Sequence, residues 1–173
     1  MTYMKSLAAG ALLAGTVLGT PAMAQDNTID IGVVTPISGT YAGIGQQIRW
    51  GLDLAAKEIN EAGGIMGRQI NLIYEDSEAN PAVATQKAEK LITSNGVNFI
   101  TGTVNSAATL SVGQLAERSN AIATTTVSYA DSITGNQCSP NVFRVNANAI
   151  VAHRKPPIVA HHRVGFDRDG YMR

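Results

Sequence analysis

The spacing of apolar positions changes twice between residues 30 and 76. Residues 30–35 form a continuous β-rich apolar run ended by Pro36, which predicts a buried strand. From Ile44 onward apolar residues return every three or four positions and predict an amphipathic helix, and residues 69–76 then alternate like a second strand. The apolar stripe of this helix consists of Ile44, Ile48, Leu52, Ala55 and Ile59. The order predicts a right-handed crossover between two parallel strands.

Three glycines lie between the predicted helix and the second strand, within "AGGIMG" at residues 62–67. Gly63 follows the helix directly, where a left-handed backbone would make a side chain clash. We therefore expect Gly63 to end the helix, and Gly64 and Gly67 to let the chain reverse tightly.

The alternation of strand and helix continues to about residue 150. Asn80 is suited to cap a second helix and Pro81 to begin it, and Asn95-Gly96 is suited to end it. The further elements expected are a strand at 97–102, a helix at 107–118 capped by Ser106, a strand at 121–127 and an apolar run at 141–145. The inner faces of these two helices are expected to contain Val83, Ala84, Ala88, Leu91, Ile92, Leu110, Leu115 and Ala116. This pattern predicts an α/β domain, a Rossmann-like open parallel sheet with helices on both faces.

The two ends of the chain differ from its body. Residues 1–24 contain one charged residue, Lys5, then "LAAGALLAGTVL" and "AMA", a pattern that predicts a cleaved export signal. The apolar stretch is shorter than the roughly 20 residues that cross a bilayer. Residues 25–150 are expected to form an N-terminal α/β lobe. Residues 151–173 contain all three histidines and fit no period, which we interpret as out-of-frame translation or as a basic disordered tail.

Charge and cysteine content narrow the classes further. Residues 25–150 have seven Lys or Arg against eleven Asp or Glu, a net charge of −4 that argues against a nucleic-acid partner. Cys138 is the one cysteine of the chain and cannot form an internal disulfide. A buried unreactive thiol and a thiol whose partner lies in a longer chain both remain open.

Ligands of open α/β sheets bind at the carboxyl ends of the strands. Three loops are expected there, at residues 36–45, 102–107 and 126–131, and they are rich in hydroxyls and small side chains and contain no Lys or Arg. Such loops suit holding a small polar anion by hydrogen bonds and suit substrate turnover poorly.

Ser106 is the most informative residue of these loops. If Ser106 caps the third helix, its hydroxyl and the N–H of Ala107 point out of the helix N-terminus, where a carboxylate is favoured. Simple capping without a ligand is the alternative. Ser128 and Tyr129 lie on the next loop of the same edge, where turn formation is the alternative role.

Motifs of catalysis and of cofactor binding do not fit the chain. The segment "GTYAGIG" at residues 39–45 is not followed by Gly-Lys-Ser/Thr, and no serine occurs in G-x-S-x-G. His161 and His162 lack carboxylate or cysteine neighbours at metal-ligand spacing. We therefore expect no cofactor, no metal and no enzyme activity. These observations argue against the hypothesis that the protein is a small exported enzyme.

Two motifs, "PISGTYAGIG" and "INEAGGIMG", occur with "NPAVATQKAEKLI", with "VNFITG" followed by "SAAT", and with "DSITGNQCSPNVFRV". Together they make the segment from Ile29 to Asn148 resemble the branched-chain amino-acid type substrate-binding proteins of ABC transporters. These are type I periplasmic binding proteins. The resemblance stops at residue 151, and no second lobe follows.

The resemblance implies two lobes that close on a small amino acid or related carboxylate and pass it to a membrane permease, with no catalysis. It implies a periplasmic location, and a ligand-sensing domain of a receptor or regulator is the alternative. By the same resemblance, the ligand-binding residues are Tyr41 and Ala42 in the first loop, Ser106 and Ala107 after the third strand, and Val127, Ser128 and Tyr129 after the fourth. Because only most of a first lobe is present, we expect ligand binding to be weak or absent.

Overall fold

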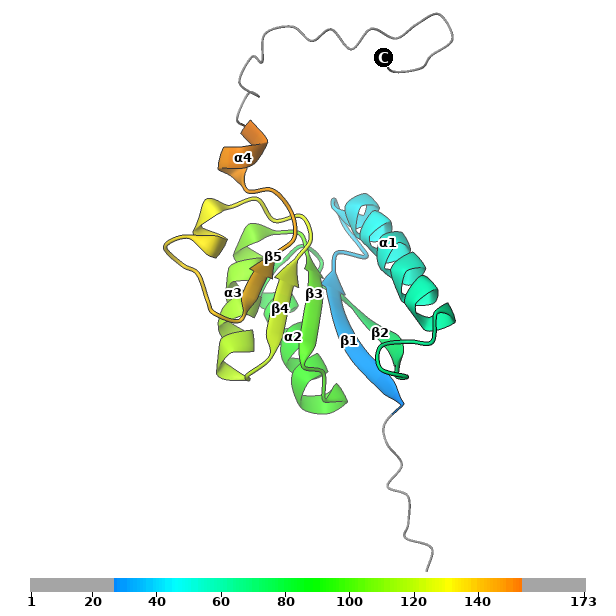
Figure 1. Cartoon of the computed structure of the whole chain (residues 1–173). Helices are drawn as coiled ribbons and strands as arrows, with labels where there is room; N and C mark the ends of the chain where they lie inside the picture. The colour runs from blue at the N-terminus through cyan, green and yellow to red at the C-terminus, as the bar shows by residue number, and fades with distance from the viewer. Residues whose placement is uncertain (1–26, 154–173) are drawn as a thin grey trace, which may run out of the picture.

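A single parallel sheet organises the protein. The computed structural model describes residues 27–153, and its five strands lie in the order β2-β1-β3-β4-β5. The strands are β1 (Thr28–Thr35), β2 (Gln69–Asp76), β3 (Phe99–Thr103), β4 (Ile122–Thr125) and β5 (Val142–Arg144). Each expected strand is present, and the predicted open parallel α/β sheet is confirmed (Figure 1).

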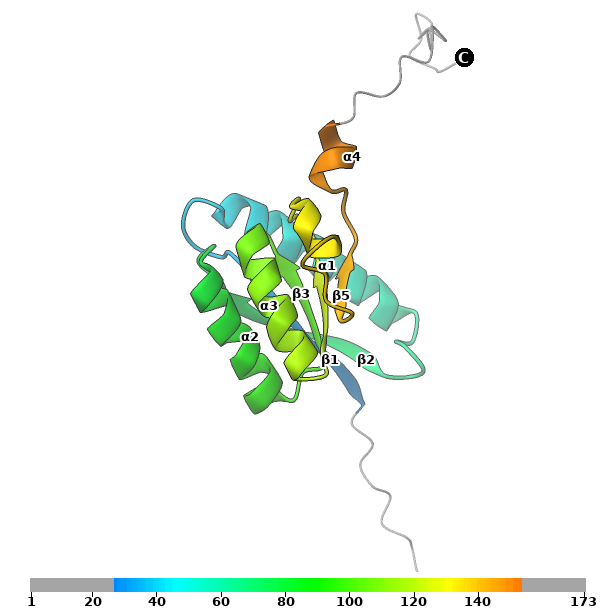
Figure 2. The same ribbon diagram turned by 90° about the vertical axis from the view of Figure 1, so that its left-hand side faces the viewer.

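Helices cover both faces of the sheet, as predicted, but unequally. They are α1 (Ala42–Glu61), α2 (Pro81–Asn95), α3 (Ser106–Arg118) and α4 (Ala149–His153), with a 3-10 helix η1 (Asp131–Thr134). Helices α2 and α3 lie side by side on one face, and α1 lies on the other (Figure 2). Between residues 27 and 153, no helix has the length and apolar character needed to cross a membrane.

The main core lies between the sheet and helices α2 and α3. Ala84, Ala88 and Leu91 of α2 and Leu115 and Ala116 of α3 are buried there, as their spacing predicted. Val83, Ile92 and Leu110, which were also expected on these inner faces, are half-buried. The side chains of β1, β3 and β4 that meet the helices include Val34, Ile100 and Ala123.

The opposite face is only partly covered, and here the predicted apolar stripe of α1 is confirmed only in part. Ile44, Ile48 and Leu52 are half-buried, whereas Ala55 and Ile59 are exposed. The reason is that α1 lies alone on its face and packs mainly against β2. Other large apolar side chains are exposed on α1 or on its side of the sheet, namely Trp50, Leu54, Phe99 and Phe143.

The glycine turn after α1 has the predicted geometry. Gly63 follows the helix with a φ of 102°, and Gly64 and Gly67 also have positive φ values. A Cβ atom on Gly64 would lie 2.1 Å from the carbonyl oxygen of Arg68, so this turn requires glycine. The amide of Asn60 then fixes the start of β2, because it donates to the carbonyl of Ile70 (2.9 Å) and accepts from its N–H (2.7 Å).

A short helix spans the predicted boundary at residue 151. Residues 149–153 form the short helix α4, although the sequence showed no helical period from residue 151 onward. The predicted export signal at residues 1–24 and residues 154–173 of the predicted tail lie outside the described residues. Cys138 is an exposed free thiol, so the alternative that it is a buried unreactive thiol is wrong.

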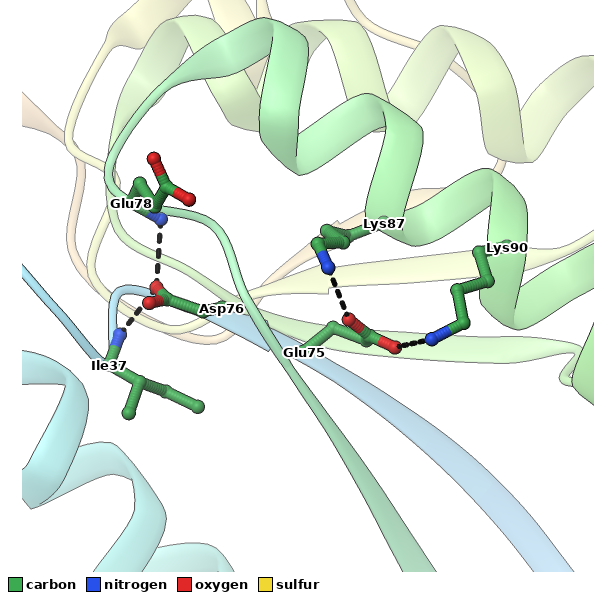
Figure 3. A network of polar contacts seen from close by, with 6 residues as sticks. All are labelled: Ile37, Glu75, Asp76, Glu78, Lys87 and Lys90. Carbon is green, nitrogen blue, oxygen red and sulfur yellow. Dashed lines mark hydrogen bonds and ion pairs between the residues drawn. The ribbon is translucent and has the colours of Figure 1, made fainter.

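Glu75 of β2 ties the sheet to α2 (Figure 3). Its carboxylate pairs with Lys90 at 2.5 Å and with Lys87 at 3.0 Å, and its side chain is 12% exposed. The hydrogen bond from Lys90, followed by that from Lys87, lowers the pKa of Glu75 below its ordinary value of 4.5. The folded carboxylate therefore keeps its charge to lower pH than the unfolded one does.

A pH dependence of stability follows from this lowered pKa. The contribution of Glu75 is complete above pH 4.5 and is lost as the pH falls below that value toward the lower pKa of the folded state. We expect Glu75→Gln to lower stability at pH 7 and to flatten its decline below pH 4.5, as measured by urea unfolding across the pH range. Glu61→Gln is the control, because Glu61 is 67% exposed and its oxygen lies 3.8 Å from Lys57. Equal pH profiles for the two variants would contradict the prediction.

Candidate functional site

The parallel sheet brings three loops together at its carboxyl edge, the edge from which α1, α3 and η1 begin (Figure 1). These loops follow β1, β3 and β4 and correspond to the three loops expected from the sequence. They contain or adjoin every candidate residue, namely Tyr41, Ala42, Ser106, Ala107, Val127, Ser128 and Tyr129. The candidate site is therefore this edge of the sheet.

The N-cap of α3 is Asn105, and the prediction that Ser106 caps this helix is wrong. The side-chain oxygen of Asn105 accepts hydrogen bonds from the N–H of Ala107 at 2.8 Å and of Ala108 at 3.3 Å. Asparagine and serine are comparably good caps, so the sequence alone could not choose between the two positions. As a consequence the N–H of Ala107 is already engaged within the protein.

Asn105 also connects two loops, because its amide nitrogen donates to the carbonyl of Ala79 at 3.3 Å. We expect Asn105→Ala to lower the free energy of unfolding by about 1 kcal/mol, the usual cost of losing an N-cap. Asn105→Asp keeps the capping oxygen and should recover most of that loss. Guanidinium unfolding followed by circular dichroism compares the two variants, and equal losses would show that the cap contributes little.

Ser106 links the second loop to the third instead of capping. Its Oγ accepts a hydrogen bond from the N–H of Ala130 at 3.3 Å. The hydroxyl is half-buried at the first turn of α3, next to the exposed Ala107. The predicted pair Ser106 and Ala107 is thus at the helix N-terminus as expected, but both groups have partners inside the protein.

Ser128 is the most buried of the candidate residues, with 1% of its surface exposed. Its Oγ is hydrogen-bonded to the hydroxyl of Thr109 at 2.5 Å and lies 3.1 Å from the carbonyl oxygen of Val104. The hydroxyl of Thr109 also donates to Thr103 at 2.8 Å. These buried hydroxyls connect β3, α3 and the third loop by hydrogen bonds. The side chain of Ser128 therefore stabilises the loop and is not accessible to a ligand.

Val127 and Tyr129, on either side of Ser128, are the accessible part of the third loop. Tyr129 is 49% exposed. Val127 lines a hollow of about 340 Å³ with Thr126 and with residues of α1, among them Ile48 and Leu52. Apolar ligand atoms could be accommodated beside Val127, between the third loop and α1.

The first loop is held by Asp76, the last residue of β2. Its carboxylate accepts from the N–H of Ile37 at 2.8 Å and of Glu78 at 2.9 Å (Figure 3). Burial alone would raise the pKa of Asp76, but hydrogen bonds from Ser38, Glu78 and Ile37 outweigh it and lower the pKa. A carboxylate at the carboxyl end of a strand was the available signal for this role.

Tyr41 and Ala42 stand at the end of the same loop, where α1 begins. Tyr41 is 46% exposed, and the N–H of Ala42 donates to the carbonyl of Gly39 at 3.1 Å. Tyr41 is therefore free to cover the edge of the sheet, whereas Ala42 contributes to the turn. The three loops together offer neutral hydrogen-bonding groups and accessible apolar and aromatic side chains, which suits binding of a small polar molecule.

The fold is an open α/β lobe with three loops at the carboxyl edge of its sheet. A family described as periplasmic binding protein matches residues 28–154, and the chain belongs to this family. The match extends slightly beyond residue 151, where the resemblance was expected to stop.

Individual relatives agree with this assignment. The chain is 36% identical over 140 residues to Leu/Ile/Val-binding protein homolog 8 of Brucella abortus, which covers 81% of this chain and 33% of the relative. Leu/Ile/Val-binding protein homolog 2 of the same species is 40% identical over 78 residues, which covers 45% of this chain and 21% of the relative. The chain thus spans between a fifth and a third of the length of these relatives.

Solved structures with the same fold include two of special interest. One is the branched-chain amino acid transporter substrate-binding protein LivJ of Streptococcus pneumoniae in complex with isoleucine, with 30% identity and a TM-score of 0.65, covering 70% of this chain and 34% of that one. The other is a solute-binding protein of an ABC transporter from R. palustris in complex with benzoate, with 33% identity and a TM-score of 0.64, covering 70% and 33%. These relatives are solute-binding proteins, so at the level of the family the fold serves binding.

Proposed function

We propose that the chain forms the first ligand-binding lobe of the solute-binding component of an ABC transporter. Its ligand would be a small amino acid of the branched-chain type or a related carboxylate, captured in the periplasm for delivery to a membrane permease. The observation that carries the proposal is the placement of three hydroxyl-rich loops at one edge of the sheet, where the N–H of Ala130 in the third loop donates to Ser106 at the N-terminus of α3. Similarity to proteins solved with isoleucine and with benzoate supports these two ligand classes.

Within the proposed site, the roles of the candidate residues divide into two kinds. Tyr41, Ala107, Val127 and Tyr129 are half-buried or exposed at the edge and would face the ligand. Ala42, Ser106 and Ser128 bond to neighbouring loop or strand groups and would hold the ligand-facing residues in place. A carboxylate near Ala107 would be stabilised by the positive end of the α3 dipole.

The test uses L-leucine and benzoate as probes in an NMR titration of the ¹⁵N-labelled chain. We expect selective shifts of the amides at residues 106–107 and 127–130, with a dissociation constant in the millimolar range or weaker. The affinity is low because the matched fold accounts for about a third of the solved relatives, so most of the enclosing surface is contributed elsewhere in them. Micromolar binding would contradict the expected weakness, and the absence of shifts at these loops with both probes would contradict the site.

A charge variant tests the site without disturbing the fold. Ala107 and Ala82 are both exposed second residues of a helix, and the N–H of each donates at 2.8 Å to a capping asparagine. Ala107→Glu should weaken carboxylate binding at least about fivefold by repulsion at the helix N-terminus, whereas an acidic residue there does not destabilise the helix. Ala82→Glu makes the same change on α2 and should leave binding unchanged.

A further inference from the structure

The third loop is held by residues that lie 14 to 20 positions further along the chain than the loop residues they bond. The guanidinium of Arg144 donates from one terminal nitrogen to the carbonyl of Ser128 and from the other to the carbonyl of Ala130. Asn146 also donates to the carbonyl of Ser128, at 3.0 Å, and the N–H of Ala149 donates to the carbonyl of Tyr129 at 2.8 Å. Three consecutive carbonyls of the loop are therefore occupied.

Arg144 reaches this position because it is the last residue of β5. Val142, two residues earlier on the same strand, packs against the core between the sheet and α3, so Arg144 points to the same face. No ion pair of the described residues 27–153 includes Arg144, and its half-buried guanidinium bonds to carbonyl oxygens instead. The planar fork of arginine can hold two carbonyls at once, which lysine cannot do in the same way.

The orientation of the peptide between Ser128 and Tyr129 follows from these contacts. Every peptide bond of the described residues is trans, so the N–H of Tyr129 points away from the carbonyl of Ser128. That carbonyl faces Arg144, and the N–H of Tyr129 therefore faces the opposite side of the loop. Within residues 27–153 this N–H donates to no protein group, whereas the next one, of Ala130, donates to Ser106.

We propose that Arg144 is a positioning residue of the ligand site, which fixes the Ser128–Tyr129 peptide so that the N–H of Tyr129 is presented to an anionic group of the ligand. Arg144 acts through the backbone and does not touch the ligand. Its positive charge, which forms no ion pair among residues 27–153, also favours an anion on the far side of that peptide. This inference rests on the proposed function for the identity of the ligand group, but the order of the loop can be measured without any ligand.

The first experiment measures amide hydrogen exchange in the ligand-free chain. Ser128 and Ala130 report on the loop, because their N–H groups donate to Thr125 and Ser106. Arg144→Met should reduce the protection of both amides at least about tenfold, as expected when hydrogen bonds from a charged donor are lost. Arg144→Lys should give an intermediate effect. Arg118→Met, on the exposed last turn of α3, is the control and should change neither amide.

The outcomes separate positioning from general stabilisation. Protection lost in the loop while the amides of β1 and β3 keep theirs supports the proposal. Unchanged protection at Ser128 and Ala130 overturns it, and so does an equal loss over the whole sheet, which would mean that Arg144 only stabilises the fold. If Arg144→Met does not fold, Arg144→Lys and Asn146→Ala provide the same comparison.

A second experiment tests whether the contacts of Arg144 with the third loop affect ligand binding. In the benzoate titration, the amide shift of Tyr129 should be present in the natural chain and at least about fivefold weaker in Arg144→Met, with the melting temperature recorded alongside. A Tyr129 shift that is unaffected by Arg144→Met would overturn the positioning role. A natural chain without any benzoate or leucine shift would count against the proposed function, while the exchange experiment would still decide whether Arg144 orders the loop.

Discussion

Replacing Gly45 by alanine is expected to lower the free energy of unfolding by about 3 kcal/mol. Gly45 is the one buried residue of α1, and a Cβ atom there would lie 1.8 Å from the carbonyl oxygen of Pro36. The clash is with backbone, so no side-chain rotation can relieve it. To accommodate the methyl group, α1 would have to move away from the first loop, which includes Tyr41.

The matched control for this substitution lies in the same helix. Gly51→Ala adds the same methyl group in the middle of α1, where a Cβ atom would meet nothing within 4 Å. Alanine is favoured over glycine in a helix interior, so this variant should be about 0.5–1 kcal/mol more stable than the natural chain. Opposite signs for the two variants in guanidinium unfolding are the expected result. A similar destabilisation of both would show that α1 itself, and not its contact with Pro36, is sensitive.

Leu91→Ala is expected to lower the free energy of unfolding by about 2–5 kcal/mol. Leu91 is fully buried in α2, and its Cδ1 lies 2.8 Å from the place where a Cβ atom on Gly32 would stand. Because Gly32 has no side chain to move inward, the cavity left by the truncation cannot be filled from the sheet. The large expected loss of stability follows because the surrounding residues cannot close the cavity.

Leu54→Ala is the control for the Leu91 prediction. Leu54 is 57% exposed on α1, and its truncation should change stability by less than about 0.5 kcal/mol. Chemical unfolding of both variants at the same pH measures the difference directly. Equal effects would contradict the view that the main core lies on the α2 and α3 side of the sheet.

Local signals in the sequence were sufficient for the elements and their order. Asn80 accepts hydrogen bonds from the N–H groups of Ala82 and Val83, and Gly96 ends α2 with a φ of 67°, as their positions predicted. Such caps depend on residues close in the sequence and can therefore be read from it. The same reasoning placed the three loops at one edge, because parallel strands all end on the same side.

Where two residues were equally suitable, the sequence could not decide. Asn105 and Ser106 are neighbouring good caps, and only the backbone conformation shows that Asn105 takes the role. The role of Asp76 in fixing the first loop was likewise missed, since its partner Ile37 is 39 positions away.

The sequence by itself determined the class of the fold, the strand and helix order, the glycine turn and the edge of the sheet at which the three loops lie. These features follow from the hydrophobic period and from short-range capping and turn chemistry. Only the tertiary structure showed which face of the sheet is well covered and that Ala55 is exposed. It also showed that Ser128 is buried while Tyr129 remains accessible. It also brought Arg144 to the third loop. These outcomes depend on contacts between segments distant in the chain, and an amphipathic pattern cannot say how much of a helix its neighbours will cover.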